Sequence, residues 1–372
     1  MTQTKLKTLE VLKSNLNISF PVGTAIAVKQ YSKKLGFDNI FSRYKKKGTD
    51  LVNLLEALIT YRLTENQSIA RASEWINRPE VLEEFKLSSF EERTLFRVLE
   101  ITGDNHEEIL LLLQNNIFSQ YEFPHTDLNL DWTTFVLWGS KAELGAYGYS
   151  RAHRPDKKQI TVGISQLRAP MNIPVGLTIK PGNLNDKSHF KPTFLQICDK
   201  LKEKSLVVFD KGGQSKDNLD LVLAHKMKYL SSKKLNKSDD KLIKTFIASK
   251  ENIVDEVQGI YGEIIKYPSR FDYFLFSEQL KKDQIETKLR MAERKFVEAK
   301  EIQLALNNGK KLPKRFIVNN PLVEIKYTYQ TKLTQLTEEQ AKKLVQNASI
   351  TGREGFFCLI SNEKLTLAEA LK

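Results

Sequence analysis

The chain is poor in the residues that disulfide-linked and zinc-binding proteins depend on. Its 372 residues include two cysteines, Cys198 and Cys358, which lie far apart in the sequence. This excludes a disulfide framework and a paired-cysteine zinc site. The five histidines, at positions 106, 125, 153, 189 and 225, show no metal-ligand spacing such as His-Glu-x-x-His. Each is therefore interpreted as a surface or packing residue.

Other absences narrow the class of protein further. No apolar run reaches the length of a membrane-spanning helix, and the first twenty residues lack the apolar core and cleavage site of a signal peptide. We therefore expect a cytoplasmic protein. No serine or cysteine sits in a nucleophile-elbow motif, and Lys211–Gly213 lacks the spacing of a phosphate-binding P-loop. Ester hydrolases and nucleotide triphosphatases become poor candidates.

The balance of charge favours a polyanionic partner. Lysine and arginine outnumber aspartate and glutamate by 58 to 45, which gives a formal net charge of +13 and an isoelectric point near 9.4. Nucleic acid is the first candidate for such a partner, and an anionic membrane surface is the second. A basic protein without any such partner remains an alternative. The length predicts two or three domains.

Residues 1–120 are predicted to be helical and to form an N-terminal region that binds DNA or dimerises. The stretch from Asp50 to Leu63 has a broad apolar face, and the segments SIARASEWI and EERTLFRVLEITG follow with helical spacing. The stretch VKQYSKKLGFDNIFSRYKKKG places aromatic residues between basic ones. It fits a DNA-reading helix-turn-helix, and a pair of solvated basic helices fits equally well.

From residue 126 the pattern changes to short β-branched and aromatic strands. FVLWG, ITVGISQL, PVGLTIK and SLVVFD are bounded by turn residues, and a helix starting at Asp186 separates the last two. Asn183 or Asn185 is expected to cap that helix, and Ser215 the helix after Asp210. We predict an α/β fold with a mixed sheet of about five strands, the first three antiparallel and the fourth parallel to the first.

Residues 236–350 are interpreted as an α+β insertion domain. This stretch holds lysine-rich loops, aromatic strands in IIKYPSRFDYFLFSEQ and a long amphipathic helix, QIETKLRMAERKFVEAKEIQLAL. The segment GFFCLISN then returns to the pattern of a buried strand. Residues 121–235 and 351–372 are accordingly assigned to one catalytic core interrupted by the insertion.

Two aspartates are the strongest candidates for chemistry. Asp131 lies among apolar residues in HTDLNLDWTTFVLWG, where an aspartate is unusual for a strand. Asp210 ends the apolar run SLVVF and precedes Gly212 and Gly213, so it should face the crevice at the carboxyl end of the sheet. Paired carboxylates of this kind can share Mg²⁺ and so support phosphoryl transfer. A strand end followed by a turn also accounts for Asp210.

A basic segment between two strands is the candidate phosphate-binding element. GYSRAHRPDKKQITVGI concentrates positive charge at the residues Arg151, His153, Arg154, Lys157 and Lys158. Lys211, beside Asp210, adds a further cation. Arginine binds phosphate through two parallel hydrogen bonds, although a solvated charged turn has the same composition.

These motifs together resemble the DDE-type insertion-sequence transposases, in the group with a β-rich insertion before the last acid. The similarity lies in LDWTTFVLWG, GYSRAHRPDKKQITVGI, PVGLTIKPGNLNDK, VVFDKGGQSKDNL and GFFCLISNEKLTLAEALK, in that order. It extends over roughly residues 125–235 and, less closely, 350–372. The resemblance implies a ribonuclease H-like core in which Asp131 is the first acid and Asp210 the second, both holding Mg²⁺ or Mn²⁺.

The resemblance also implies a function and its partners. Such a protein cuts and joins DNA at insertion-sequence ends, binds double-stranded DNA, acts as a homodimer and belongs to the cytoplasm of a prokaryote, near the nucleoid. The family's third acid, a glutamate, falls in the helix after GFFCLISN, beyond Lys372, and Glu363 and Glu369 come too early to match it. We therefore expect a C-terminally truncated, catalytically incomplete transposase. Alternatives are a non-catalytic DNA-binding remnant and an unrelated ribonuclease H-like nuclease.

Overall fold

The computed structural model describes residues 22–44, 48, 50–139, 141–310, 320–325 and 329–371. The chain divides into two compact units, residues 1–124 and 125–372. The boundary lies between the predicted end of the helical region at residue 120 and the change to a strand pattern at residue 126. No helix within the described ranges is both long and apolar enough to cross a membrane.

The first unit is helical over its described residues, as predicted. Its helices are α1 (Val22–Lys34), α2 (Phe37–Phe41), α3 (Leu51–Thr64), α4 (Ile69–Ile76), α5 (Pro79–Glu84), α6 (Glu92–Asp104) and α7 (His106–Gln120). The side chain of Asp50 caps α3 by accepting from the Asn53 N–H at 3.2 Å. Apolar side chains of α3, such as Tyr61, pack in the core of the unit.

The candidate helix-turn-helix corresponds to α1, α2 and the turn between them. Gly36 makes that turn with φ at 71°, a backbone conformation that glycine adopts without strain. The predicted stretch continues into Lys45–Lys47, which lie outside the described residues. A role for this helix pair in reading DNA remains a prediction.

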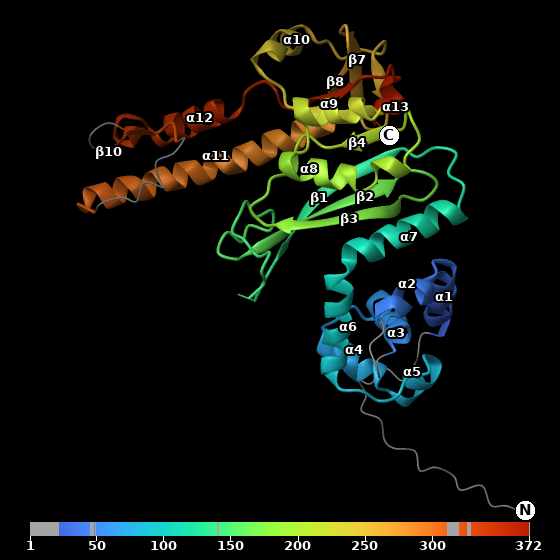
Figure 1. Ribbon diagram of the computed structural model, residues 1–372. Helices are drawn as coiled ribbons and strands as arrows, with labels where there is room; N and C mark the ends of the chain where they lie inside the picture. The colour runs from blue at the N-terminus through green and yellow to red at the C-terminus, as the bar shows by residue number, and fades with distance from the viewer. Residues whose placement is uncertain are drawn as a thin grey trace, which may run out of the picture. The chain divides into compact units, whose positions relative to one another are not determined.

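The second unit is built on a mixed sheet of nine strands in the order β3-β2-β1-β4-β5-β11-β8-β7-β6. The first five are β1 (Leu128–Val136), β2 (Gln159–Leu167), β3 (Ile173–Pro181), β4 (Leu206–Phe209) and β5 (Lys228–Lys233). β1, β2 and β3 pair antiparallel, whereas β4 runs parallel to β1 and β5 parallel to β4. These strand directions confirm the predicted mixed sheet, in which the first three strands are antiparallel and the fourth is parallel to the first (Figure 1).

Helices α8 (Asp186–Leu195) and α9 (Lys216–Ala224) cover one face of these strands. Phe190 of α8 packs between two strand residues, with ring centroids 5.8 Å from Trp132 and 4.8 Å from Phe209. Asn185 caps α8, accepting from the Ser188 N–H. The helix begins at Asp186, as predicted, and a separate 3₁₀ turn at Cys198–Lys200 follows it.

The sheet is larger than the five strands that we expected. β11 (Phe356–Ser361) pairs antiparallel with β5, and β8 (Phe271–Ser277), β7 (Ile260–Lys266) and β6 (Ile253–Asp255) continue from it. The strands of the predicted insertion therefore extend the same sheet. Pairing with β11 covers the edge of β5, which would otherwise present unpaired backbone groups.

The remaining elements lie around this extension. They are α10 (Asp240–Thr245), α11 (Glu278–Asn307), β9 (Val323–Ile325), β10 (Tyr329–Thr331), α12 (Glu338–Ser349) and α13 (Leu367–Leu371). α12 packs along α11 through a small core that includes Phe296 and Val345 (Figure 1). α13 lies against the sheet through Ala370, in a cluster with Leu230 and Tyr273.

Candidate functional site

Strand register brings the two predicted aspartates together. β1 and β4 pair in parallel, with Leu128 opposite Val207 and Leu130 opposite Phe209. One further step along both strands sets Asp131 opposite Asp210. Neighbouring strands are about 4.8 Å apart, and residues in register point to the same face. The expectation that the two carboxylates lie side by side agrees with this register.

An open pocket of about 540 Å³ lies where these carboxylates emerge. Its lining includes both aspartates, Asn129 and Val208 from the same strands, and Leu371 from α13. Alternation along β1 and β4 puts Asn129, Asp131, Val208 and Asp210 on one face of the sheet, opposite the face that α8 covers. The pocket is thus bounded by the sheet and by α13.

Each aspartate is held by backbone N–H groups close to it in sequence. Asp131 Oδ1 accepts from the Trp132 N–H at 2.8 Å. Asp210 Oδ1 accepts from the Gly212 N–H at 2.9 Å and from the Gly213 N–H at 3.3 Å. These bonds leave the Oδ2 atoms of Asp131 and Asp210 unused, and both aspartates are exposed. Both side chains are therefore oriented while accessible to a cation.

A third carboxylate, Asp186, lies beside this pair, although the sequence marks it only as the first residue of a helix. The Asp186 Oδ2 and Asp210 Oδ1 atoms both lie within 3.0 Å of the point that a Cβ on Gly212 would occupy. Burial raises the pKa of the Asp186 carboxyl, and the charges of Asp210 and Asp131 raise it further, against the lowering effect of Arg151. Negative charge is therefore concentrated at this edge of the sheet.

Arg151 occupies the strand edge beside Asp131. β4 ends at Phe209, while β1 continues to Val136, so β1 has an open edge beyond that point. There the Arg151 guanidinium donates to the Trp132 carbonyl and, at 2.6 Å, to Asp186 Oδ2. This arginine was predicted to bind phosphate. In the structure it joins the basic segment to the carboxylate cluster, and its binding of phosphate stays a prediction.

The other predicted phosphate-binding residues lie on the same segment or beside Asp210. Arg154 makes two hydrogen bonds to the Asp156 carboxylate, at 2.8 and 2.7 Å. The Arg154 hydrogen bond lowers the pKa of Asp156 to about 2. Lys157 lies 5.1 Å from the ring centroid of Trp138. His153 and Lys211 are exposed and Lys158 is partly buried, and their roles in binding DNA remain predictions.

Neither glutamate near the end of the described chain reaches the carboxylate pair. Glu363 forms an ion pair with Lys228. Glu369 Oε2 accepts from the N–H and the hydroxyl of Thr366, both at 2.8 Å, at the start of α13. Among the residues that the structure describes, no three His, Cys, Asp or Glu side chains are arranged to hold a metal ion. With Asp186 bonded to Arg151, the site presents two carboxylates.

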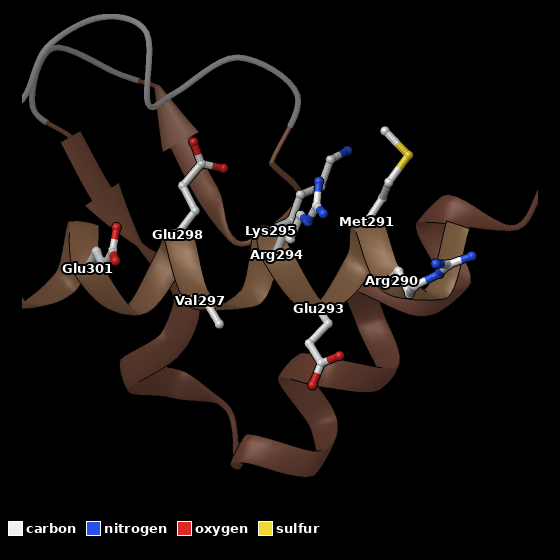
Figure 2. A pocket seen from close by; sticks show the side chains of 8 residues that line it. All are labelled: Arg290, Met291, Glu293, Arg294, Lys295, Val297, Glu298 and Glu301. Atoms are coloured by element: carbon white, nitrogen blue, oxygen red, sulfur yellow. The ribbon is translucent and has the colours of Figure 1, made fainter. Parts of the chain in front are cut away.

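A second open pocket, of about 690 Å³, lies along α11 and contains none of the predicted site residues. Its lining alternates acids and bases, among them Arg290, Glu293, Lys295 and Glu298. Figure 2 shows these side chains leaving the helix in different directions, without converging on one point. This surface has the character of a solvated helix face, so the pocket between β1, β4 and α13 is the better candidate.

Comparison with known proteins gives a likeness in structure and none in sequence. No family model matches the chain, and no curated protein matches it. Among solved structures, the chain is similar to a piggyBac transposase in a synaptic complex with hairpin DNA, at a TM-score of 0.37 and 10% sequence identity. The match covers 70% of this chain, which spans 61% of the length of that transposase chain.

Proposed function

We propose that the chain acts on DNA by metal-dependent phosphoryl transfer, in the manner of the DDE-type transposases that its motifs resemble. One observation carries the proposal: the β1–β4 register sets Asp131 opposite Asp210, and both line one open pocket. The chain also carries a net charge of +13, which favours a polyanionic substrate. Cutting and joining at insertion-sequence ends is the specific reaction that we propose.

The donor set fits a divalent cation such as Mg²⁺ or Mn²⁺. Mg²⁺ prefers oxygen ligands, and one or two carboxylates together with water commonly hold it. Asp131 and Asp210 would be those carboxylates. The raised pKa of Asp186, caused by burial and by the charges of Asp210 and Asp131, indicates negative charge that a cation would offset. When bound, the ion activates the attacking oxygen and stabilises the leaving oxygen at phosphorus.

The protein's own residues have separate tasks in this proposal. Asp131 and Asp210 bind the cation, and the turn at Gly212 and Gly213 fixes the Asp210 carboxylate. Arg151 binds the edge of β1 at the Trp132 carbonyl and neutralises the charge of Asp186 beside the pair. Positioning of this kind matters because misplacing a reacting group by about 1 Å costs about a hundredfold in rate.

The test is nicking of a duplex that carries an insertion-sequence end, with Mg²⁺ or Mn²⁺. Any metal-dependent cut that the parent chain makes should be abolished by Asp131→Asn and by Asp210→Asn. The same cut should be retained in Asp217→Asn, an exposed control in the first turn of α9. Cutting that survives both changes would contradict the proposal. Metal-independent DNA binding without any cut would favour the second candidate function, that of a non-catalytic DNA-binding protein. That candidate is supported by the finding that the described residues present two carboxylates at the site, whereas the family has three.

A further inference from the structure

The segment between β1 and β2 exposes large aromatic rings among cations. Trp138 is 74% exposed, Tyr149 is 85% exposed and Tyr147 is 62% exposed. Residues 138–158 carry five lysine and arginine side chains against two acidic ones. Three exposed aromatic rings on one short segment offer faces to a flat partner, and the positive charge of the segment favours an anionic one.

The cations lie directly beside the indole ring of Trp138. The Arg154 Cζ atom is 4.9 Å and the Lys157 Nζ atom is 5.1 Å from the ring centroid. Asp156 fixes the Arg154 guanidinium through two hydrogen bonds. Most of the indole surface is nevertheless open to solvent, so the ring can still accept a flat partner while the cations remain close enough to meet a phosphate.

The backbone that presents these rings is held firmly. Buried Gln159 donates through Nε2 to the carbonyl of Tyr149 at 2.8 Å and to that of Gly182 at 3.0 Å. Gly148 passes so close to Gly182 that a Cβ there would lie 2.1 Å from the Gly182 carbonyl oxygen. Tyr149 therefore has an anchored backbone and an exposed ring, as expected of a built surface.

The same segment is joined to the candidate carboxylate site. Arg151 donates to the carbonyl of Trp132 and to Asp186. Trp138 follows Asp131 by seven residues, which span at most about 23 Å of extended strand. About six or seven stacked nucleotides cover that length, at about 3.4 Å each. One DNA strand can therefore reach both places.

We propose that this surface binds unpaired nucleotides of a DNA strand, with a base stacked on Trp138 and its phosphates near Arg154 and Lys157. An aromatic ring stacks on any base whose face is open. In a duplex those faces are covered by neighbouring base pairs, and the grooves present hydrogen-bonding edges instead. An exposed indole flanked by cations therefore suits single-stranded DNA better than duplex DNA. The proposal deepens the proposed function by naming the form of DNA that this part of the site takes.

Intrinsic fluorescence reports this contact selectively. The chain has three tryptophans, and two of them, Trp75 and Trp132, are only 4% and 1% exposed. The full chain is titrated in EDTA with a single-stranded oligonucleotide, a duplex with a ten-nucleotide single-stranded extension and a blunt duplex. We expect saturable quenching by the first two probes and weaker quenching by the blunt duplex.

The variants separate stacking from charge. Trp138→Ala should lose the quenching and weaken single-strand affinity at least about fivefold, with blunt-duplex affinity changed less than twofold. Trp138→Phe should retain most of the affinity without the quenching. Met171→Ala, which removes an equally exposed side chain from the β2–β3 turn, is the matched control and should behave as the parent.

Three results would overturn the proposal: unchanged single-strand affinity in Trp138→Ala, equal loss for single-stranded and blunt duplex DNA, or equal competition by an acidic polypeptide. The assay contains no divalent metal and needs no cleavage. Single-strand binding that depends on Trp138 in a chain that never nicks DNA would contradict the proposed function alone. Metal-dependent nicking with no role for Trp138 in binding would contradict this inference alone.

Discussion

Two replacements of Asp210, by asparagine and by alanine, distinguish its role as a hydrogen-bond acceptor in the local turn from the role of its negative charge. The Oδ1 atom of Asp210 accepts from the N–H groups of Gly212 and Gly213. Asparagine keeps an oxygen at that position, so Asp210→Asn should preserve the turn. Asp210→Ala removes the acceptor, although water can replace it because the residue is exposed. We therefore expect a loss of about 1 kcal/mol in the free energy of unfolding.

For a unit of this size, that loss lowers Tm by about 2–4 °C. Asp210→Asn should melt within about 1 °C of the parent, since it keeps the turn and removes charge repulsion. Both variants should lose any metal-dependent nicking that the parent chain shows. Thermal unfolding followed by circular dichroism, together with the nicking assay, tests the two parts. Nicking retained in Asp210→Asn would refute the role of the charge, and equal melting of both variants would refute the role of the turn.

Three further outcomes follow from the described contacts. Gly212→Ala would place a Cβ 2.4 Å from a carboxylate oxygen of Asp186, so we expect a loss of nicking with little change in Tm. Gly213→Ala would instead place a Cβ 2.9 Å from the buried indole ring of Trp132. It should lower Tm and reduce the free energy of unfolding by about 1–3 kcal/mol. Glu354 is buried, which alone would raise its pKa, but the Lys288 ammonium and backbone N–H groups lower that pKa from 4.5 to about 2. Because the folded-state pKa is depressed, its stabilisation is present above about pH 4.5 and is lost as the pH falls toward 2. Glu354→Gln should therefore destabilise by on the order of 3 kcal/mol at pH 7, and urea unfolding should show the difference shrinking below pH 4.5. Alanine at Lys157 and Lys158 should reduce the slope of log affinity for DNA against log salt by about 2; an unchanged slope would show that these lysines do not contact phosphates.

Local sequence patterns predicted the part of the fold in which strands are short and bounded by turns. The hairpins from β1 to β3 and the crossover through α8 followed from gap lengths and from the alternation of apolar residues. The pairing of β5 with β11 could not be read in this way, because 122 residues separate the end of β5 at Lys233 from the start of β11 at Phe356. Nothing in the local sequence of either strand indicates which strand it pairs with. The predicted sheet of about five strands is consequently smaller than the observed sheet of nine.

The sequence predicts the site residues that lie on or at the end of strands better than those that lie on neighbouring loops and helices. Asp131 and Asp210 stood out because carboxylates are rare in apolar strands. The sequence marks Asp186 only by its place at the start of a helix, and its approach to Asp210 depends on the missing side chain of Gly212. The sequence predicts only phosphate binding for Arg151. It does not show that β1 extends beyond the end of β4, so that the Trp132 carbonyl is free to accept a hydrogen bond from Arg151. The apolar pattern predicts a strand that includes Trp138, although β1 ends two residues earlier.

Binding of Mn²⁺ to the full chain, followed by electron paramagnetic resonance, tests the central claim most directly. If Asp131 and Asp210 hold a divalent cation between them, the parent chain should bind Mn²⁺ saturably. Asp131→Asn and Asp210→Asn should each weaken that binding at least about tenfold, while Asp217→Asn should bind as the parent does. Equal Mn²⁺ affinity in the parent and both site variants would contradict the claim that these carboxylates form a metal site.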